Sequence, residues 1–299
     1  MGRRDESAIA SGTNGSTRTP GLVAVVSDDS AAPAAVTGSK RQTLAGMLRG
    51  EAEVITRLSG LTVIAKPVGA ADDAAKLIET VREMGAVGAI FLPDVEADRA
   101  QHTQRAVVEW AGPAVLTDQD ATAIAVAASL LTALARADLD PASSRVVITG
   151  ATTLPLLRPL LIAAGIGEID SWNAVDAVGF GLKRLAYGAD AVIDLIGRAS
   201  RKLLFDQNQP ILISPGPRID DRIAVPGLLM AILQCSARII DMEAYDRCVL
   251  TLVAATPPGR LLPEPDPNLA LVIADTAAAG LRRRHAQPRS TRLPKRGLG

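Results

Sequence analysis

The sequence is poor in the residues that most often carry chemistry or crosslinks. It has two cysteines, two histidines and 2% aromatic residues in 299 positions. Cys235, Cys248 and two scattered histidines do not form a four-ligand zinc site, and they do not resemble a secreted disulfide framework. We therefore expect a reducing, cytoplasmic environment. A core with so few aromatics must be built from Ala, Val, Leu and Ile, which suits helices packed on a parallel sheet.

Excess charge of one sign and long hydrophobic runs are also missing. Lys plus Arg and Asp plus Glu number 32 each, so net charge attracts neither nucleic acid nor an anionic membrane. The most apolar run, residues 154–166, is short and contains Arg158, and residues 1–19 have no apolar signal segment. We expect a soluble protein without a membrane partner. The arginine-rich end, residues 282–296, is interpreted as a solvated tail and not as a nucleic-acid-binding arm, because no aromatics are interleaved for stacking.

Strand-like and helix-like segments alternate along the chain, which is typical of parallel sheets with helices on both faces. Apolar runs predict strands at 22–27, 87–92, 114–116, 145–149, 168–171, 189–195 and 210–214, and two further strand-like pieces within 53–68, split at Gly60. Helical patterns predict helices at 97–110, 121–137, 156–164, 226–234, 241–255 and 268–284, with another directly after Asp73. Residues 30–42 are expected to form a loop.

These elements divide into two α/β units. We predict a disordered arm at 1–19, a first α/β domain at 20–120, a doubly wound, Rossmann-like domain at 121–284 and a basic, disordered tail at 285–299.

The turn after strand 145–149 is where a Rossmann fold binds a dinucleotide pyrophosphate. Of the G-x-G-x-x-G fingerprint only Gly150 is present; Thr152 places a Cβ at the phosphate position and Pro155 lacks a donor. Asp170, twenty residues on, is the candidate for binding ribose hydroxyls, with a turn residue as the alternative. NAD or NADP binding is therefore open, and we expect it to be weak.

Several segments, in order along residues 20–280, resemble the malic enzymes. They are LVAVVSD (22–28), LAGM (44–47), VLTDQDATAIAVAASLLTAL (115–134) and RVVITGA (145–151), followed by LKRLAYGADAVIDLIG, PILISPGP, IAVPGLLMAIL and LLPEPDPNLALVIADTAAA. The resemblance implies a malate-binding α/β domain followed by a Rossmann-like domain. It also implies Mg²⁺- or Mn²⁺-assisted, NAD(P)-dependent oxidation and decarboxylation of malate to pyruvate, with a lysine base and a tyrosine acid.

Carried over by residue, the resemblance leaves an eroded site. Thr56 falls at the lysine base, Pro93 replaces one metal carboxylate, and Asp94 and Asp118 remain as candidate metal ligands. Asp221 falls at a substrate asparagine. The family's tyrosine segment is reduced to Thr19-Pro20-Gly21, while the chain's two tyrosines, Tyr187 and Tyr245, lie in the second unit. Asp94 and Asp118 could share a cation with waters, or each could be a turn residue after a strand.

Two functions remain open at this level. One is a divergent malic-enzyme-like oxidoreductase acting on a small 2-hydroxy or 2-oxo acid; the other is a non-catalytic binding or scaffolding protein that keeps the fold. If Asp94, Asp118 and Asp221 converge in an open cleft, an enzyme remains possible; if they are scattered, binding or scaffolding is the better interpretation. We also expect a homodimer, because the segments 22–27 and 53–65 are strongly apolar for a domain with so few covering helices.

Overall fold

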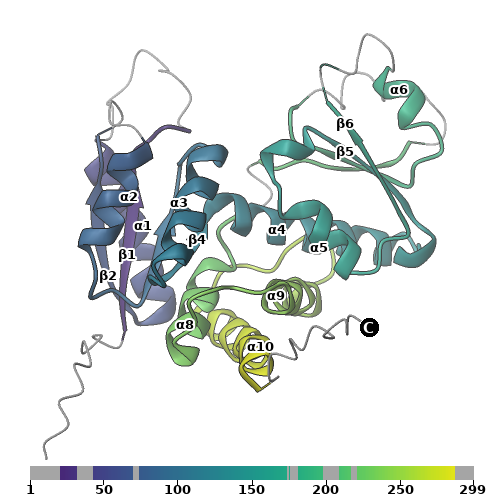
Figure 1. Ribbon diagram of the computed structural model, residues 1–299. Helices are drawn as coiled ribbons and strands as arrows, with labels where there is room; N and C mark the ends of the chain where they lie inside the picture. Colours follow the sequence, from purple (N-terminus) through teal and green to yellow (C-terminus); the bar gives the residue numbers. More distant parts are fainter. Residues whose placement is uncertain are drawn as a thin grey trace, which may run out of the picture.

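The computed structural model describes residues 21–31, 43–69, 74–173, 175, 181–197, 209–216 and 221–286. Within them the chain forms two parallel four-stranded sheets joined by a group of helices (Figure 1). The mixed α/β class predicted from the sequence is confirmed. The predicted arm, most of the 30–42 loop and the tail beyond residue 286 lie outside the described residues.

The first sheet has the strand order β2-β1-β3-β4. Its central strands are buried on both faces, which is why they read as continuous apolar runs and not as alternating ones. Helices α2 and α3 follow β2 and β3, and the α2 and α3 helices contact each other. The elements are β1 (Leu22–Ser27), β2 (Thr62–Pro67), α2 (Ala74–Glu83), β3 (Ala89–Leu92), α3 (Ala97–Glu109) and β4 (Ala114–Thr117).

The first of the two strands expected within residues 53–68 is wrong. Residues 53–59 are the end of helix α1 (Leu44–Ser59), and only the second piece is a strand, β2. Leu48, Ala52 and Ile55 are the buried residues of α1, and their spacing of four and three is helical. The β-branched run at 54–56 suggested a strand, but burial of this apolar face outweighs local propensity.

The second sheet has the order β6-β5-β7-β8 and is also parallel throughout. Strand β5 lies at its centre, between β6 and β7, as the first strand of a Rossmann-like unit should. The elements are β5 (Arg145–Thr149), α5 (Leu157–Ala163), β6 (Glu168–Trp172), α6 (Leu182–Leu185), β7 (Ala191–Asp194) and β8 (Ile211–Ile213).

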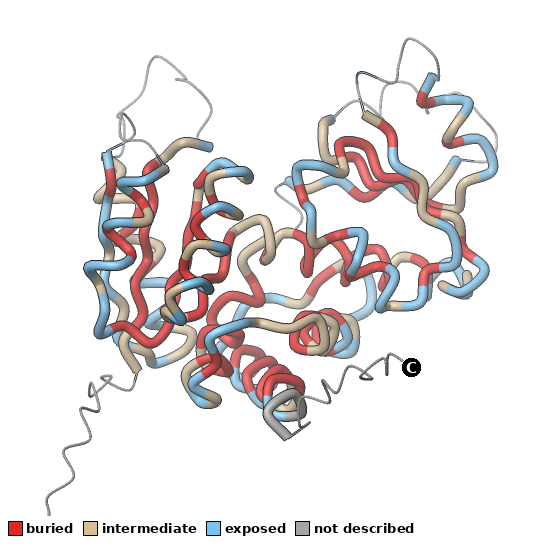
Figure 2. The backbone as a smooth tube through the Cα atoms, viewed as in Figure 1, coloured by how far each residue is buried: buried red, intermediate tan, exposed pale blue. Residues whose placement is uncertain are grey.

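Four helices connect the two sheets: α4 (Asp118–Arg136), α8 (Val225–Cys235), α9 (Met242–Ala255) and α10 (Pro267–Ala286). Helix α8 contacts α10 closely; a Cβ added at Gly227 would lie 2.6 Å from the Ile273 side chain. Helices α8 and α10 also contact α1, so these two late helices pack against the first α/β unit (Figures 1 and 2). One buried apolar cluster accordingly includes residues from both sheets. None of the described helices is long and apolar enough to cross a membrane.

Candidate functional site

The carboxyl ends of β3 and β4 bring Asp94 and Asp118 together. Leu92 pairs with Thr117 in the parallel register, so the turns after these strands are neighbours. The backbone N–H of Asp94 donates to Oδ2 of Asp118 over 2.8 Å. Asp94 has a left-handed backbone with φ 53°, a conformation that Asp tolerates better than most residues. In open α/β sheets ligands bind at this edge, so the two acids lie where a site is expected.

Asp118 is the first residue of α4 and is held in place by the cap of that helix. The Thr117 hydroxyl accepts from the Asp120 N–H over 3.1 Å, and Asp120 Oδ2 accepts from the Thr117 N–H over 3.2 Å. This reciprocal capping box fixes the first turn. It directs Asp118 toward Asp94, whereas Asp120 bonds Gln104 instead, at 2.8 Å.

Arg222, which precedes α8, brings a positive charge to these acids. Its Nη1 lies 2.6 Å from Oε2 of Glu51 on helix α1, and its Nη2 lies 3.0 Å from Oδ1 of Asp94. Asp221 is also close: its charge raises the pKa of Arg222, and its Oδ2 accepts from the Thr122 hydroxyl at 3.5 Å. Asp94 and Asp118 therefore lie together, and Arg222 pairs Asp94 with Glu51, while Asp221 precedes Arg222 in the chain and bonds Thr122.

Burial controls the protonation of Asp118. It raises the pKa of this carboxyl to about 7, against the lowering effect of the Asp94 N–H; the Asp94 charge raises it further and Arg222 lowers it. The Oδ1 atom is buried and has no hydrogen-bond partner among the described residues. For Arg222, burial lowers the pKa, but the charges of Glu51 and Asp94 outweigh burial and raise it above its usual value. Asp118 can thus exchange a proton near neutral pH, while Arg222 stays charged.

These residues do not fit Mg²⁺ or Mn²⁺ as the resemblance implies. Pro93 supplies no carboxylate, and one oxygen of Asp94 is paired with Arg222. Within the described residues no three His, Cys, Asp or Glu side chains are grouped so that they could hold a metal ion. A divalent cation would also lie next to a fixed guanidinium charge, which is unfavourable.

Among the described residues, no hydrogen bond or ion pair joins Thr56 to Asp94, Asp118 or Arg222. It is an exposed residue of α1 whose carbonyl accepts from the Gly60 N–H over 2.8 Å. The residue that α1 presents to the cluster is Glu51, which sequence reasoning missed together with Arg222. Arg222 directly follows two aspartates in the sequence, and no local pattern there names Glu51 as its partner.

The turn at Gly150 is filled by the chain's own side chains. Gly150 has φ 71°, and a Cβ there would lie 2.4 Å from Cγ2 of Ile196 in the loop after β7. The chain continues as a 3₁₀ turn, Ala151–Thr153, and α5 begins only at Leu157, whose N–H already donates to the Leu154 carbonyl. A Rossmann fold instead points free helix N–H groups at the pyrophosphate here.

Asp170 is committed to an ion pair. Its Oδ2 lies 2.6 Å from Nη2 of Arg145, the first residue of β5, and Arg145 also pairs with Glu168 at 3.1 Å. In the register Asp170 lies opposite Val147, while Trp172 lies at the end of β6, opposite Thr149. The carboxylate is thus paired with the opposite end of β5 from Gly150.

The two tyrosines occupy different surroundings. Tyr187 is 79% exposed, whereas Tyr245 on α9 is buried with its hydroxyl 3.4 Å from Oδ2 of Asp120. Burial, then the Asp120 charge, raises the pKa of Tyr245 well above its usual value. Burial likewise raises the pKa of Asp120. Tyr245 is thereby held in its neutral form on the far side of the α4 cap from Asp118.

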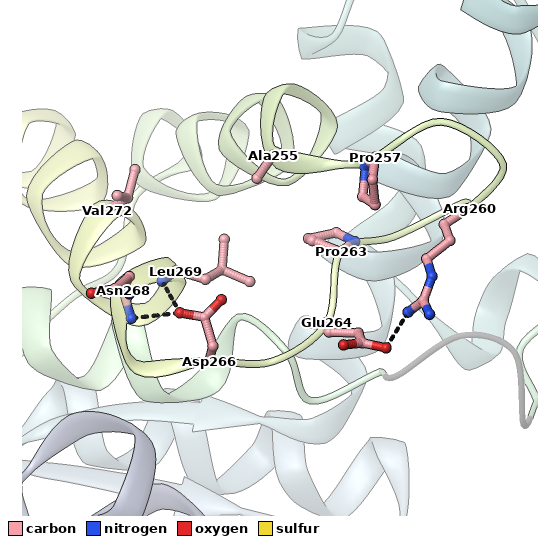
Figure 3. Close-up of a pocket in the computed structure, with 9 residues that line it drawn as sticks. All are labelled: Ala255, Pro257, Arg260, Pro263, Glu264, Asp266, Asn268, Leu269 and Val272. Atoms are coloured by element: carbon pink, nitrogen blue, oxygen red, sulfur yellow. Dashed lines mark hydrogen bonds and ion pairs between the residues drawn. The ribbon is translucent and has the colours of Figure 1, made fainter.

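An open cavity of about 550 Å³ lies between the end of α9 and the start of α10 (Figure 3). Its polar side chains bond within the loop itself. Asp266 Oδ1 accepts from the N–H groups of Asn268 and Leu269, and Arg260 pairs with Glu264. These contacts cap α10 and brace the loop, so Asp266 Oδ1, Arg260 and Glu264 are engaged within the loop itself.

Comparisons with known proteins identify the fold. No model of a protein family matches the chain, and no curated protein matches its sequence. Among solved structures it is similar to the malic enzyme of Entamoeba histolytica, with a TM-score of 0.75 and 19% identity over 89% of this chain and 70% of that one. It is also similar to the malic enzyme of Pyrococcus horikoshii, with a TM-score of 0.71 and 17% identity over 90% of this chain and 78% of that one.

A third similar structure is the NAD-dependent malic enzyme of Thermotoga maritima, with a TM-score of 0.69 and 18% identity over 86% of this chain and 84% of that one. The fold of this chain is therefore that of malic enzymes, which confirms the fold that the sequence resemblance implied. At these identities the likeness establishes the fold, and the reaction has to be argued from the residues.

Proposed function

We propose that this chain is a malic-enzyme-like protein in which NAD(P)-dependent oxidative decarboxylation of malate is lost or altered. The observation that carries the proposal is the Gly150 turn. Ile196 fills the space beside Gly150, and a 3₁₀ turn replaces the helix start that would hold the pyrophosphate. A dinucleotide would have to displace these groups, which costs binding energy that the site does not return.

The residues around Asp118 support the same proposal. The side chains found there are Glu51, Asp94, Asp221 and Arg222, and none of them replaces both a lysine base and a tyrosine acid. Each general acid or base contributes about 10²–10⁴-fold to a rate, so loss of both removes several powers of ten.

A scaffolding role is the alternative function, and the Arg222 ion pairs favour it. They connect the segment before α8, which contains Arg222, to Glu51 on α1 and to Asp94 in the turn after β3. Glu51 is 171 residues and Asp94 128 residues from Arg222 in the sequence. Such bridges hold the two parts of the chain together without any ligand.

A small carboxylic acid is the candidate ligand for either function. A cavity of about 200 Å³ is lined by apolar residues that include Ile55, Leu58 and Pro226, and by the paired Glu51 and Arg222. Arg57 also lines it, and the Arg57 side chain has no ion-pair partner within the described residues. A guanidinium at the edge of an apolar pocket suits a carboxylate with a short hydrocarbon body.

Calorimetry and an activity assay test the proposal. Titration with NAD and with NADP should show no binding at micromolar concentrations, and malate with Mn²⁺ and either cofactor should give no NAD(P)H above the blank. The malic enzyme of Thermotoga maritima, measured alongside, is the positive control for the assay. Micromolar affinity for either dinucleotide, or turnover at ordinary enzyme rates, would refute the proposal.

A further inference from the structure

We infer that the guanidinium of Arg222 is the resident cation of the acid cluster and takes the place that a divalent metal ion would need. This inference does not depend on whether a dinucleotide binds. It rests on how one arginine is shared among acids from different parts of the fold.

The geometry of Arg222 is that of a bridging cation. Its two terminal nitrogens contact different carboxylates, Glu51 at 2.6 Å and Asp94 at 3.0 Å. Asp94 in turn donates its backbone N–H to Asp118, so Asp94 contacts both the guanidinium of Arg222 and the carboxylate of Asp118. Charge-assisted hydrogen bonds of this kind are among the strongest in proteins.

Partial burial determines how much the chain loses when an ion pair of Arg222 is removed. The Glu51 side chain is 14% exposed, that of Arg222 30% and that of Asp94 36%, so water compensates only in part for a lost partner, and least at Glu51. Without Arg222, the carboxylates of Glu51 and Asp94 would lose the guanidinium that both contact, and Asp94 would remain beside Asp118. Mg²⁺ and Mn²⁺ prefer oxygen ligands and accept one or two carboxylates with waters. A variant without this guanidinium should therefore bind a divalent cation at these carboxylates.

Thermal melting of the full chain with and without Mn²⁺ tests this inference. The parent protein, freed of metal with a chelator, should show no rise in melting temperature up to about 10 mM Mn²⁺ or Mg²⁺. Arg222→Ala should melt about 2–6 °C lower, since two carboxylates in partly buried ion pairs lose their shared partner. Added Mn²⁺ should restore part of that loss, and the restoration should disappear in the double variant Arg222→Ala with Asp94→Asn.

Arg145→Ala is the matched control, because Arg145 also bridges two acids, Glu168 and Asp170. Glu168 is 63% exposed and Asp170 34%, so water solvates Glu168 once Arg145 is gone and only one partly buried acid remains; Mn²⁺ should restore nothing. If Arg222→Ala does not fold, Arg222→Gln is measured in the same way. A rise with Mn²⁺ in the parent that Asp94→Asn abolishes would overturn the inference. So would a folded Arg222 variant that responds to Mn²⁺ no more than the parent.

Discussion

Replacing Asp118 by Asn removes a carboxyl whose pKa the fold raises, and we expect Asp118→Asn to be more stable than the parent at pH 8. Asn keeps the shape of the side chain, and its Oδ1 can still accept from the Asp94 N–H that now bonds Asp118 over 2.8 Å. The substitution removes a buried negative charge, that of a carboxylate whose Oδ1 has no hydrogen-bond partner among the described residues.

The size of the effect follows from the pKa. Burial raises the pKa of the Asp118 carboxyl from 3.8 to about 7. Each pKa unit corresponds to about 1.4 kcal/mol, so complete burial would give about 4 kcal/mol. Asp118 is partly accessible to solvent, and screening reduces this figure to about 2 kcal/mol at pH 8.

The sign of the pH dependence is fixed by the direction of the shift. The pKa of Asp118 is higher in the folded chain than in the unfolded one, so the folded state binds its proton more tightly. The associated stability is fully present below pH of about 4 and is lost as the pH rises to about 7. The parent should therefore weaken over this range relative to Asp118→Asn, and the two proteins should converge near pH 4.

Urea denaturation of both proteins at acidic, neutral and mildly alkaline pH measures the difference. Glu79→Gln serves as the control, because Glu79 is 58% exposed in a surface pair with Lys76. Its effect should stay within about 0.5 kcal/mol at every pH. If Asp118→Asn were less stable than the parent at pH 8, or if the difference did not change with pH, the burial argument would be wrong.

Three further predictions concern other parts of the molecule. In a Tyr187→Phe variant, no tyrosinate absorbance should appear near pH 10 while the chain is folded, because burial holds the pKa of Tyr245 well above that value; reversible ionisation there would contradict this. Gly150→Ala should lower the free energy of unfolding by about 2 kcal/mol, since φ is 71° and Ile196 lies 2.4 Å from the new Cβ; equal stability in urea would count against the turn as described. We propose a homodimer through the edge strand β2, so light scattering should give twice the 31.1 kDa chain mass. Ile64→Lys, at a side chain 39% exposed, should give a monomer, and a parent mass near 31.1 kDa would exclude the dimer.

Prediction from the sequence succeeded where the signal was local. The strands at 22–27 and 145–149 are runs of Val, Ile and Ala bounded by polar turn residues, and both form as predicted. Alternation of such runs with amphipathic segments was enough to indicate parallel sheets, because parallel strands need crossover helices. It failed at 53–59, where a β-branched run lies inside a helix whose buried residues share one face.

The candidate site shows the limit of sequence reasoning more clearly. Asp94 and Asp118 each lie in the turn after an apolar strand that the sequence predicts, and these two strands pair side by side. Glu51 and Arg222 could not be predicted as neighbours, because 171 residues separate them and neither has a local pattern that names its partner. Packing of α8 against α1 brings them together. The sequence by itself thus determined the apolar strands and their alternation with helices. Only the tertiary structure decided that residues 53–59 are helical and that Arg222 pairs with both Glu51 and Asp94, since burial of a face and ion pairing depend on neighbours in space.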